Sequence, residues 1–276
     1  MSSRALIVAG MHRSGTSLIT NWLYHCGLQV GESLLGADIG NEEGHYEDVE
    51  FLRLHEEILS GNGLSPGGLI HDQQVSISEY QLAKLKAVIG VKENHYEQWG
   101  WKEPRTCLFL DTYHELLPGA KYLIIIRDYT AVVSSLLKRT FDGVDKSYAS
   151  RSFATRLKWN WWKKKRRQKK FYKDYAEDYL KVWIDYNEHI LNIVRQLPKS
   201  DYLVVNYTLM EKDDSQVFSY LTRDWRFKLE YYPFSKVYNK NLISPQADLR
   251  PFLKDPDLVS KARELENGLT KFMCMD

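Results

Sequence analysis

The chain has 276 residues, of which 43% are hydrophobic, and its 38 basic residues nearly balance its 36 acidic ones. This length suits one large domain or two small ones, and the formal net charge of +2 does not require a polyanionic partner. The three cysteines are widely spaced and fit no metal-binding pattern. The N-terminal apolar run is too short for a signal peptide, and no run approaches membrane-spanning length, so we expect a cytoplasmic protein with reduced thiols.

The first predicted elements are a buried strand, a glycine-containing loop and a helix. The strand is the apolar run Ala5–Ala9, and the helix has apolar residues at helical spacing from Leu18 to Cys26. Between them lies Gly-Met-His-Arg-Ser-Gly-Thr-Ser, residues 10–17. This arrangement directs backbone N–H groups and the positive end of the helix at one place, where a phosphate or sulfate can bind. A loop that only turns the chain is the alternative.

The loop differs from the nucleotide loop of ATP- and GTP-binding proteins, which has the form G-x-x-x-x-G-K-[ST]. Gly10 and Gly15 have the right separation, and Ser17 occupies the position of the magnesium-binding hydroxyl. Thr16, however, stands at the lysine position, and the cation, Arg13, precedes the second glycine. The loop therefore predicts an anion site of a different kind.

The next segment is rich in glycine and contains Asn41-Glu-Glu-Gly-His-Tyr-Glu47. An amphipathic helix is predicted over Val49–Leu59 and another over Tyr80–Ile89. Between these helices, Ser60–His71 holds four glycines and one proline, which favours a mobile loop at the rim of a substrate site.

Two further strands end in basic residues. Trp99–Arg105 is interpreted as a short strand that ends at a proline, with Lys102 and Arg105 at its carboxyl end, and a helix is expected over Leu108–Leu117. Ligands of open α/β sheets bind at such strand ends.

Tyr122–Ile126 is a continuous apolar run typical of a parallel strand, and Arg127 follows it. The helix predicted next carries Ser134 and Ser135 in its first two turns. This unit is a second candidate anion site, although Arg127 could instead form a salt bridge with Asp128 or another acid.

The rest of the chain contains a predicted loop at Phe141–Arg156 and the basic run Lys163–Lys170, which follows several tryptophans. The run is either a solvated helix face or loop near an anionic cofactor, or a binding surface for nucleic acid or an acidic acceptor. A long helix over Phe171–Leu197 and a strand at Tyr202–Val205 follow. Strands alternating with helices predict an α/β fold with a doubly wound, mostly parallel central sheet flanked by helices.

These motifs together resemble the sulfotransferase family of the bacterial type, which uses 3′-phosphoadenosine 5′-phosphosulfate (PAPS) as sulfuryl donor. The loop resembles the family's [RK]-S-G-T-[ST] donor loop, and Lys102-Glu-Pro-Arg105 resembles the K-[DE]-P segment of tyrosylprotein and related sulfotransferases. Arg127 and Ser135 match the spacing of the pair that holds the 3′-phosphate, with Ser134 as the fallback. Asn206-Tyr207 resembles the segment that closes the sheet in many members.

The resemblance implies a P-loop-like fold in a single domain, residues 1–276, with a donor-binding core over about 4–210 and residues 211–276 packing on it. It implies PAPS binding without a metal, in which the donor-site residues would be Arg13, Ser14, Gly15, Thr16, Ser17, Arg127 and Ser135. Lys102 and Arg13 would neutralise the sulfuryl group and the leaving phosphate. The arginine in the loop and the missing C-terminal R-K-G-x-x-G-D-W-K segment depart from the soluble small-molecule enzymes, and Lys163–Lys170 is a candidate to complete the nucleotide pocket.

The acceptor hydroxyl needs a general base, for which Glu47 is the first choice, Glu32 the second and His45 the third. His12 lies inside the loop and is expected to face the donor. The acceptor itself, whether carbohydrate, lipid-linked or a small phenolic molecule, is not defined by the sequence. Two other functions remain open: a P-loop kinase or NTPase that uses ATP and magnesium, and a non-enzymatic module that binds anions or nucleic acid through Lys163–Lys170.

Overall fold

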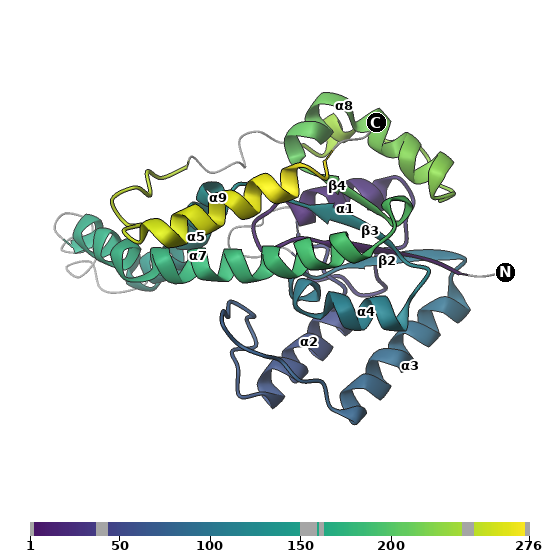
Figure 1. Cartoon of the computed structure of the whole chain (residues 1–276), viewed down its shortest axis with the longest axis horizontal. Helices are drawn as coiled ribbons and strands as arrows, with labels where there is room; N and C mark the ends of the chain where they lie inside the picture. Colours follow the sequence, from purple (N-terminus) through teal and green to yellow (C-terminus); the bar gives the residue numbers. More distant parts are fainter. Residues whose placement is uncertain (1–2, 37–43, 150–158, 160–162, 239–245, 274–276) are drawn as a thin grey trace.

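The computed structural model describes residues 3–36, 44–149, 159, 163–238 and 246–273. Within these residues, four parallel strands form one sheet in the order β2-β1-β3-β4 (Figure 1). The strands are β1 (Arg4–Ala9), β2 (Gln98–Lys102), β3 (Lys121–Ile125) and β4 (Tyr202–Val205). The chain leaves β1 to one side for β2 and then crosses to the other side for β3 and β4. The predicted doubly wound α/β fold is therefore confirmed.

Helices cover both faces of the sheet because alternate residues of each buried strand point to opposite sides. Ala5 and Ile7 of β1 belong to one core cluster, and Leu6 and Val8 belong to the other. The second cluster is covered by α1 (Thr16–His25) and α8 (Tyr207–Ser219). The first is covered by α2 (Val49–Gly61), α3 (Glu79–His95), α4 (Leu110–Leu116), α5 (Tyr129–Ala149), α7 (Lys164–Gln196) and α9 (Pro256–Thr270).

Short helical turns connect several of these elements. Among the described residues, 3₁₀ turns lie at Pro104–Phe109, Lys199–Asp201 and Phe234–Lys236, and a π turn at Tyr220–Asp224 extends α8. The helix predicted from residue 108 is thus a 3₁₀ turn that continues into α4.

The loop predicted at Phe141–Arg156 is wrong for residues 141–149, which continue α5. Phe141 is buried, and its ring lies 6.2 Å from that of Trp159 and 5.9 Å from that of Phe171. These long-range aromatic contacts anchor a helix whose local sequence is mostly polar. Residues 150–156 lie outside the described part of the chain.

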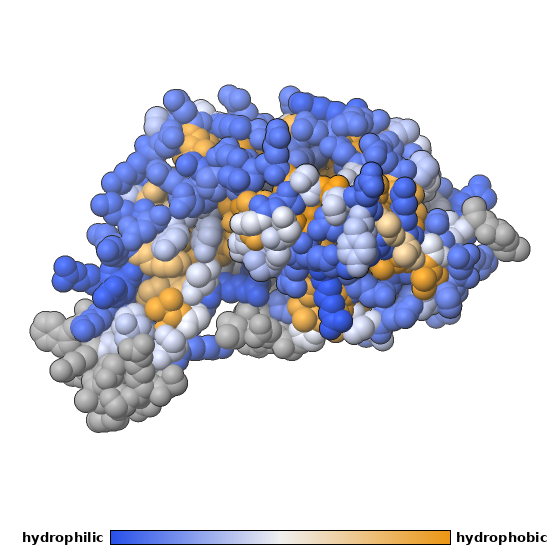
Figure 2. All heavy atoms as spheres, turned by 90° about the horizontal axis from the view of Figure 1, so that it is seen from below, coloured by the Kyte–Doolittle hydropathy of each residue, from blue (hydrophilic) through white to orange (hydrophobic). Residues whose placement is uncertain are grey.

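Two cysteines, Cys26 and Cys107, are buried free thiols, and Cys274 lies outside the described residues. No described helix combines the length and the apolar character that a bilayer crossing needs. The underside of the molecule is largely hydrophilic with smaller apolar patches (Figure 2).

The backbones of β1 and β2 pack closely at Gly100. A Cβ atom at this position would lie 2.5 Å from the Leu6 carbonyl oxygen. Replacing Gly100 by alanine is expected to lower the free energy of unfolding by about 1–3 kcal/mol, as other overpacked core positions do. Urea denaturation measures the change. Gly90→Ala in α3 is the control, since nothing lies within 4 Å of its added Cβ, and it should be neutral or stabilising. Equal loss in both variants would contradict the close strand packing.

Candidate active site

The loop between β1 and α1 is the centre of the candidate site. Gly10 touches the end of β3, since a Cβ there would lie 2.5 Å from the Ile125 carbonyl oxygen. Arg13 and Gly15 adopt left-handed backbone conformations with φ of 69° and 94°. These turns bring the chain into the N-terminus of α1, whose first N–H groups lie outside the helical hydrogen-bond ladder. The strand, loop and helix predicted from the sequence are all present.

The three hydroxyl side chains of the loop differ in their exposure to solvent. Ser14 and Thr16 are buried, with 2% and 3% of their surface exposed. Ser17 is partly exposed, and its Oγ accepts a hydrogen bond of 3.0 Å from Lys102 Nζ. Of the three hydroxyls, that of Ser17 is thus the one placed beside a cation.

Lys102 lies on one side of the loop because β2 pairs with β1 in parallel, with Lys102 opposite Val8. Its Nζ also donates to the His45 carbonyl oxygen at 3.0 Å and to Glu47 Oε1 at 2.8 Å. Lys102 and Glu47 are buried, so their ion pair is shielded from water. Removing one partner of such a pair leaves a buried charge without compensation.

Arg127 lies on the other side of the loop, two residues after the end of β3. Its Nη1 donates to the Arg13 carbonyl oxygen at 2.9 Å, and Arg13 Nε donates to Ser135 Oγ at 2.9 Å. The structure thus brings Arg13, Arg127 and Ser135 together. Ser134, the fallback, accepts a hydrogen bond from the Ala247 N–H at 2.8 Å instead. Arg127 Nε is buried and has no hydrogen-bond partner among the described residues.

A third arginine, Arg139, joins this cluster and was missed by the sequence reasoning. Burial, together with the nearby charges of Arg139 and Arg127, lowers the pKa of Arg13 to about 10. Like charges held this close are unfavourable unless an anion lies between them. Arg139 follows Ser135 by four residues, or one helical turn, and this spacing was the signal available in the sequence.

Glu103 is a second residue that the sequence reasoning left out. Its carboxylate is fully buried and contacts Arg105 Nη1 and His55 Nδ1, the latter at 2.5 Å. Burial would raise the pKa of Glu103, but the hydrogen bond and charge of His55, with Arg105, lower it to about 2. Glu103 therefore links α2 to the segment after β2 and supports the position of Lys102.

The Ser60–His71 segment, predicted to be a mobile rim, is tied to the site at two points. Arg105 Nε donates to the Pro66 carbonyl oxygen at 2.7 Å, and the Tyr186 hydroxyl donates to the Gly68 carbonyl oxygen at 2.7 Å. The end of α2 reaches Gly61, and the rest of the segment is a loop held against α7.

The three candidate bases lie in different surroundings. Glu47 contacts Lys102, and His45 is buried beside it with Nδ1 3.8 Å from Glu47 Oε1. Glu32 is exposed and accepts a hydrogen bond of 3.1 Å from the hydroxyl of Tyr96, a residue that precedes β2. Glu47 is therefore the carboxylate in direct contact with the cation at the loop.

The basic run Lys163–Lys170 lies in and just before the first two turns of α7. Lys170 and Lys163 precede Tyr179 by nine and sixteen residues, roughly 14 and 24 Å along a helix that rises 1.5 Å per residue. Tyr179 hydrogen-bonds Thr140, the neighbour of Arg139. The run therefore lies beyond the arginine cluster and away from the loop.

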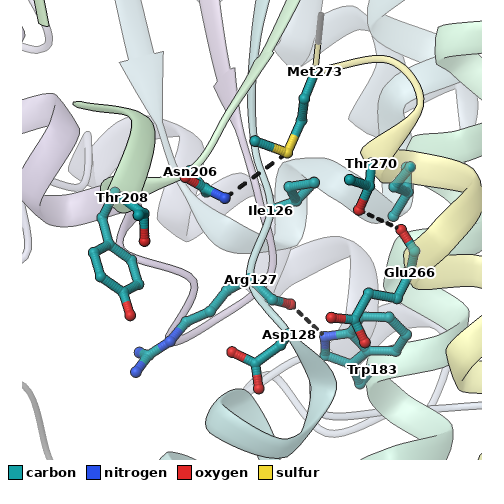
Figure 3. A pocket seen from close by; sticks show the side chains of 11 residues that line it. Ile126, Arg127, Asp128, Trp183, Asn206, Thr208, Glu266, Thr270 and Met273 are labelled. Carbon is teal, nitrogen blue, oxygen red and sulfur yellow. Dashed lines mark hydrogen bonds between the residues drawn. The ribbon is translucent and has the colours of Figure 1, made fainter. Parts of the chain in front are cut away.

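A pocket opens beside Arg127, at the carboxyl ends of β3 and β4 (Figure 3). Asn206 reaches across it toward Met273, and the Trp183 indole donates to the Arg127 carbonyl oxygen at 3.3 Å. Glu266 and further residues of α9 form the opposite wall. The C-terminal helix thus lies next to the arginine cluster.

Comparison with known proteins assigns the family. A sequence model of the Sulfotransferase family matches residues 5–224, so the chain belongs to the sulfotransferase family. The fold is similar to that of the sulfotransferase domain from the curacin biosynthetic pathway, with 16% identity, coverage of 97% of this chain and 98% of that chain, and a TM-score of 0.52.

A sulfotransferase from Mycobacterium avium is also similar in fold, with 14% identity, coverage of 98% of this chain and 76% of that chain, and a TM-score of 0.57. A comparison with curated proteins finds no significant match. The family predicted from the sequence is thus confirmed, and its members catalyse sulfotransfer.

His12 makes the stability of the protein depend on pH. Its Nε2 is buried without a hydrogen-bond partner among the described residues. Burial, and then the charge of Arg105, lower the pKa of His12 from 6.5 to about 3, although Glu103 opposes the shift. The unfolded chain therefore binds a proton below pH 6.5 that the folded protein does not, and stability falls as the pH is lowered from 6.5 toward 3.

We expect the His12→Gln variant to lose less stability than the wild type between pH 7 and pH 5, by about 2 kcal/mol. Urea denaturation at the two pH values measures the difference. In this window Glu103, whose pKa falls from 4.5 to about 2 on folding, contributes little, since its stabilising effect is lost only at lower pH. His95→Gln, at an exposed position, is the control and should follow the wild type. An unchanged pH dependence in His12→Gln would contradict the buried neutral imidazole.

Proposed function

We propose that this sulfotransferase transfers a sulfuryl group from PAPS to a hydroxyl group of its acceptor. One observation carries the proposal: the loop at residues 10–17 contacts Lys102, which is paired with Glu47, on one side and Arg127 and Ser135 on the other. PAPS has a phosphosulfate at its 5′ end and a phosphate at its 3′ position. Cations on two sides of one loop, Lys102 on one side and the arginines on the other, match these two anions.

The 3′-phosphate would bind between Arg127, Ser135 and Arg13, with Arg139 as a further cation. Arg127 Nε is a buried donor that lacks a protein partner among the described residues, and a phosphate oxygen would satisfy it. Arg139 would supply charge that the C-terminal basic segment supplies in the soluble small-molecule enzymes. The 5′-phosphate would lie over the N–H groups of Gly15, Thr16 and Ser17, beside Ser14.

Lys102 would stabilise the sulfuryl oxygens and Glu47 would act as the general base. The acceptor oxygen attacks sulfur in line, the bond from sulfur to the phosphate oxygen breaks, and the acceptor proton passes to the Glu47 carboxylate. Positive charge placed on the group being transferred is the main source of catalysis in the related phosphoryl transfers. We propose that Lys102 and the N–H groups of the loop provide it here and that no metal is needed.

Isothermal titration tests the donor site. Wild type should bind 3′-phosphoadenosine 5′-phosphate without metal, and more tightly than adenosine 5′-phosphate, which lacks the 3′-phosphate. Arg127→Ala should weaken binding of the bisphosphate about 30-fold or more while hardly affecting adenosine 5′-phosphate, since one partner of a charged hydrogen bond is removed. Arg139→Ala should act in the same direction.

The matched control is Arg250→Ala, because exposed Arg250 pairs only with its neighbour Asp248 in the described residues. Its affinity for the bisphosphate should equal that of the wild type. Binding of ATP with magnesium in place of the bisphosphate would overturn the proposal in favour of a kinase or NTPase.

Replacing Glu47 by glutamine tests the base. We expect turnover to fall about 10²–10⁴-fold, the usual contribution of a general base, while affinity for the bisphosphate is kept or increased, since Lys102 loses its anionic partner. The measurement is the conversion of PAPS to the bisphosphate with a panel of carbohydrate, lipid-linked and phenolic acceptors. Glu32→Gln, the same chemical change at an exposed position, should keep full activity. If Glu32→Gln were inactive and Glu47→Gln active, the assignment of the base would be wrong.

A further inference from the structure

The N-terminal third of α7 carries a cationic surface, here called the basic face, which faces solvent. It is formed by seven exposed side chains: Lys163, Lys165, Arg166, Arg167, Lys169, Lys170 and Lys173. Lys164 pairs with Asp145 at 2.6 Å. Residues 163–173 contain eight of the 38 basic residues of the chain and none of the 36 acidic ones, so the rest of the chain has 30 basic and 36 acidic residues. The positive charge of the protein is thus concentrated at one place.

The basic face is unfavourable for the helix that carries it. The positive end of a helix dipole lies at its N-terminus, where cations destabilise and acidic residues stabilise. The first turn of α7 has no acidic residue, and its N-cap position makes no side-chain hydrogen bond. Like charges three and four residues apart, such as Lys165 and Lys169, repel each other. A segment that breaks the local rules of helix stability in this way is typical of a functional surface.

The basic face does not serve the candidate active site. Its seven residues precede Tyr179, which hydrogen-bonds the neighbour of Arg139, by six to sixteen residues, roughly 9 to 24 Å along α7, while charges in physiological salt are screened over about 8 Å. In Figure 1 this part of α7 lies at the left end of the molecule, away from the sheet, and Figure 2 shows hydrophilic side chains projecting at the same end. The partner of the basic face is therefore separate from the donor.

We propose that the basic face binds the surface of a bilayer that contains anionic lipids. Clusters of four to eight lysines and arginines on one helix are the pattern that anionic headgroups recognise. Five of the seven residues are lysines, which are depleted at interfaces between proteins, and the aromatic or apolar centre of such an interface is missing among them. A nucleic acid long enough to extend past the basic face would also contact the rest of the chain, which has more acidic than basic residues. A flat bilayer would contact only the projecting end.

The binding would be electrostatic, without insertion into the bilayer. The aromatic side of the same helix segment is already used, since the Phe171 ring packs 5.9 Å from Phe141 and the Tyr172 ring 5.6 Å from Phe252. Attachment should therefore be reversible and sensitive to salt. It does not depend on the donor site, so bisphosphate titration and membrane binding test different parts of the protein.

Co-sedimentation with vesicles tests the proposal. Wild type should sediment with vesicles of equal parts phosphatidylglycerol and phosphatidylcholine at low salt, and much less at high salt or with phosphatidylcholine alone. The triple variant Lys165→Glu, Arg166→Glu, Lys169→Glu should partition at least about 100-fold more weakly, since each cation contributes about fivefold. Its thermal stability should equal or exceed that of the wild type, because acidic residues suit this end of the helix.

The matched control is Lys86→Glu, Lys212→Glu, Arg263→Glu, which makes the same charge change at exposed positions on α3, α8 and α9. It should sediment far more strongly than the α7 variant and bind the bisphosphate like wild type. Equal loss in both triple variants, or no sedimentation of wild type with the anionic vesicles, would overturn the proposal. Tighter binding of wild type to a short DNA duplex than to vesicles at the same phosphate concentration would overturn it in favour of nucleic acid.

Discussion

The parallel pairing of β1 with β2 and β3 is the constraint on which the candidate site depends. Parallel strands end at the same edge of a sheet, so the chain segments that follow them meet there. The register places Lys102 opposite Val8 and Ile124 opposite Ala9. The loop after β1 therefore has Lys102, from β2, on one side. On the other side it has Arg127, which follows β3. The parallel pairing alone brings these cations to the loop.

Buried charge has to be compensated, and this second constraint explains the interactions beneath the loop. Glu103 is held by His55 and Arg105, and Arg105 in turn holds the loop at Pro66. Lys102 is held by Glu47 in the same way. The lysine is thus fixed before any substrate arrives, which lowers the reorganisation that catalysis requires. The arginine cluster differs, because its members repel one another, and an anion would relieve that repulsion.

The strands and the loop were predictable from the sequence because each depends on local pattern. Apolar runs mark β1, β3 and β4, and glycines with one cation mark the loop between β1 and α1. The helical course of residues 141–149 was not predictable, since it depends on rings from Trp159 and Phe171 that are distant in the chain. The same holds for the contact between Glu103 and His55. The sequence ranked Glu47 above Glu32 as the candidate base, and the contact of Glu47 with Lys102 favours the same order.

The central claim is that the two anionic parts of the donor bind on opposite sides of the loop. The 5′ end would lie beside Lys102, and the 3′-phosphate would lie beside the arginines. A crystal structure of the protein with 3′-phosphoadenosine 5′-phosphate tests it most directly. We predict that the 3′-phosphate lies within hydrogen-bond distance of Arg127 and Ser135, and that the 5′-phosphate lies over the N–H groups of Gly15–Ser17 with a free oxygen directed toward Lys102. A nucleotide bound in the reverse direction, or one that leaves Arg127 untouched, would contradict the account.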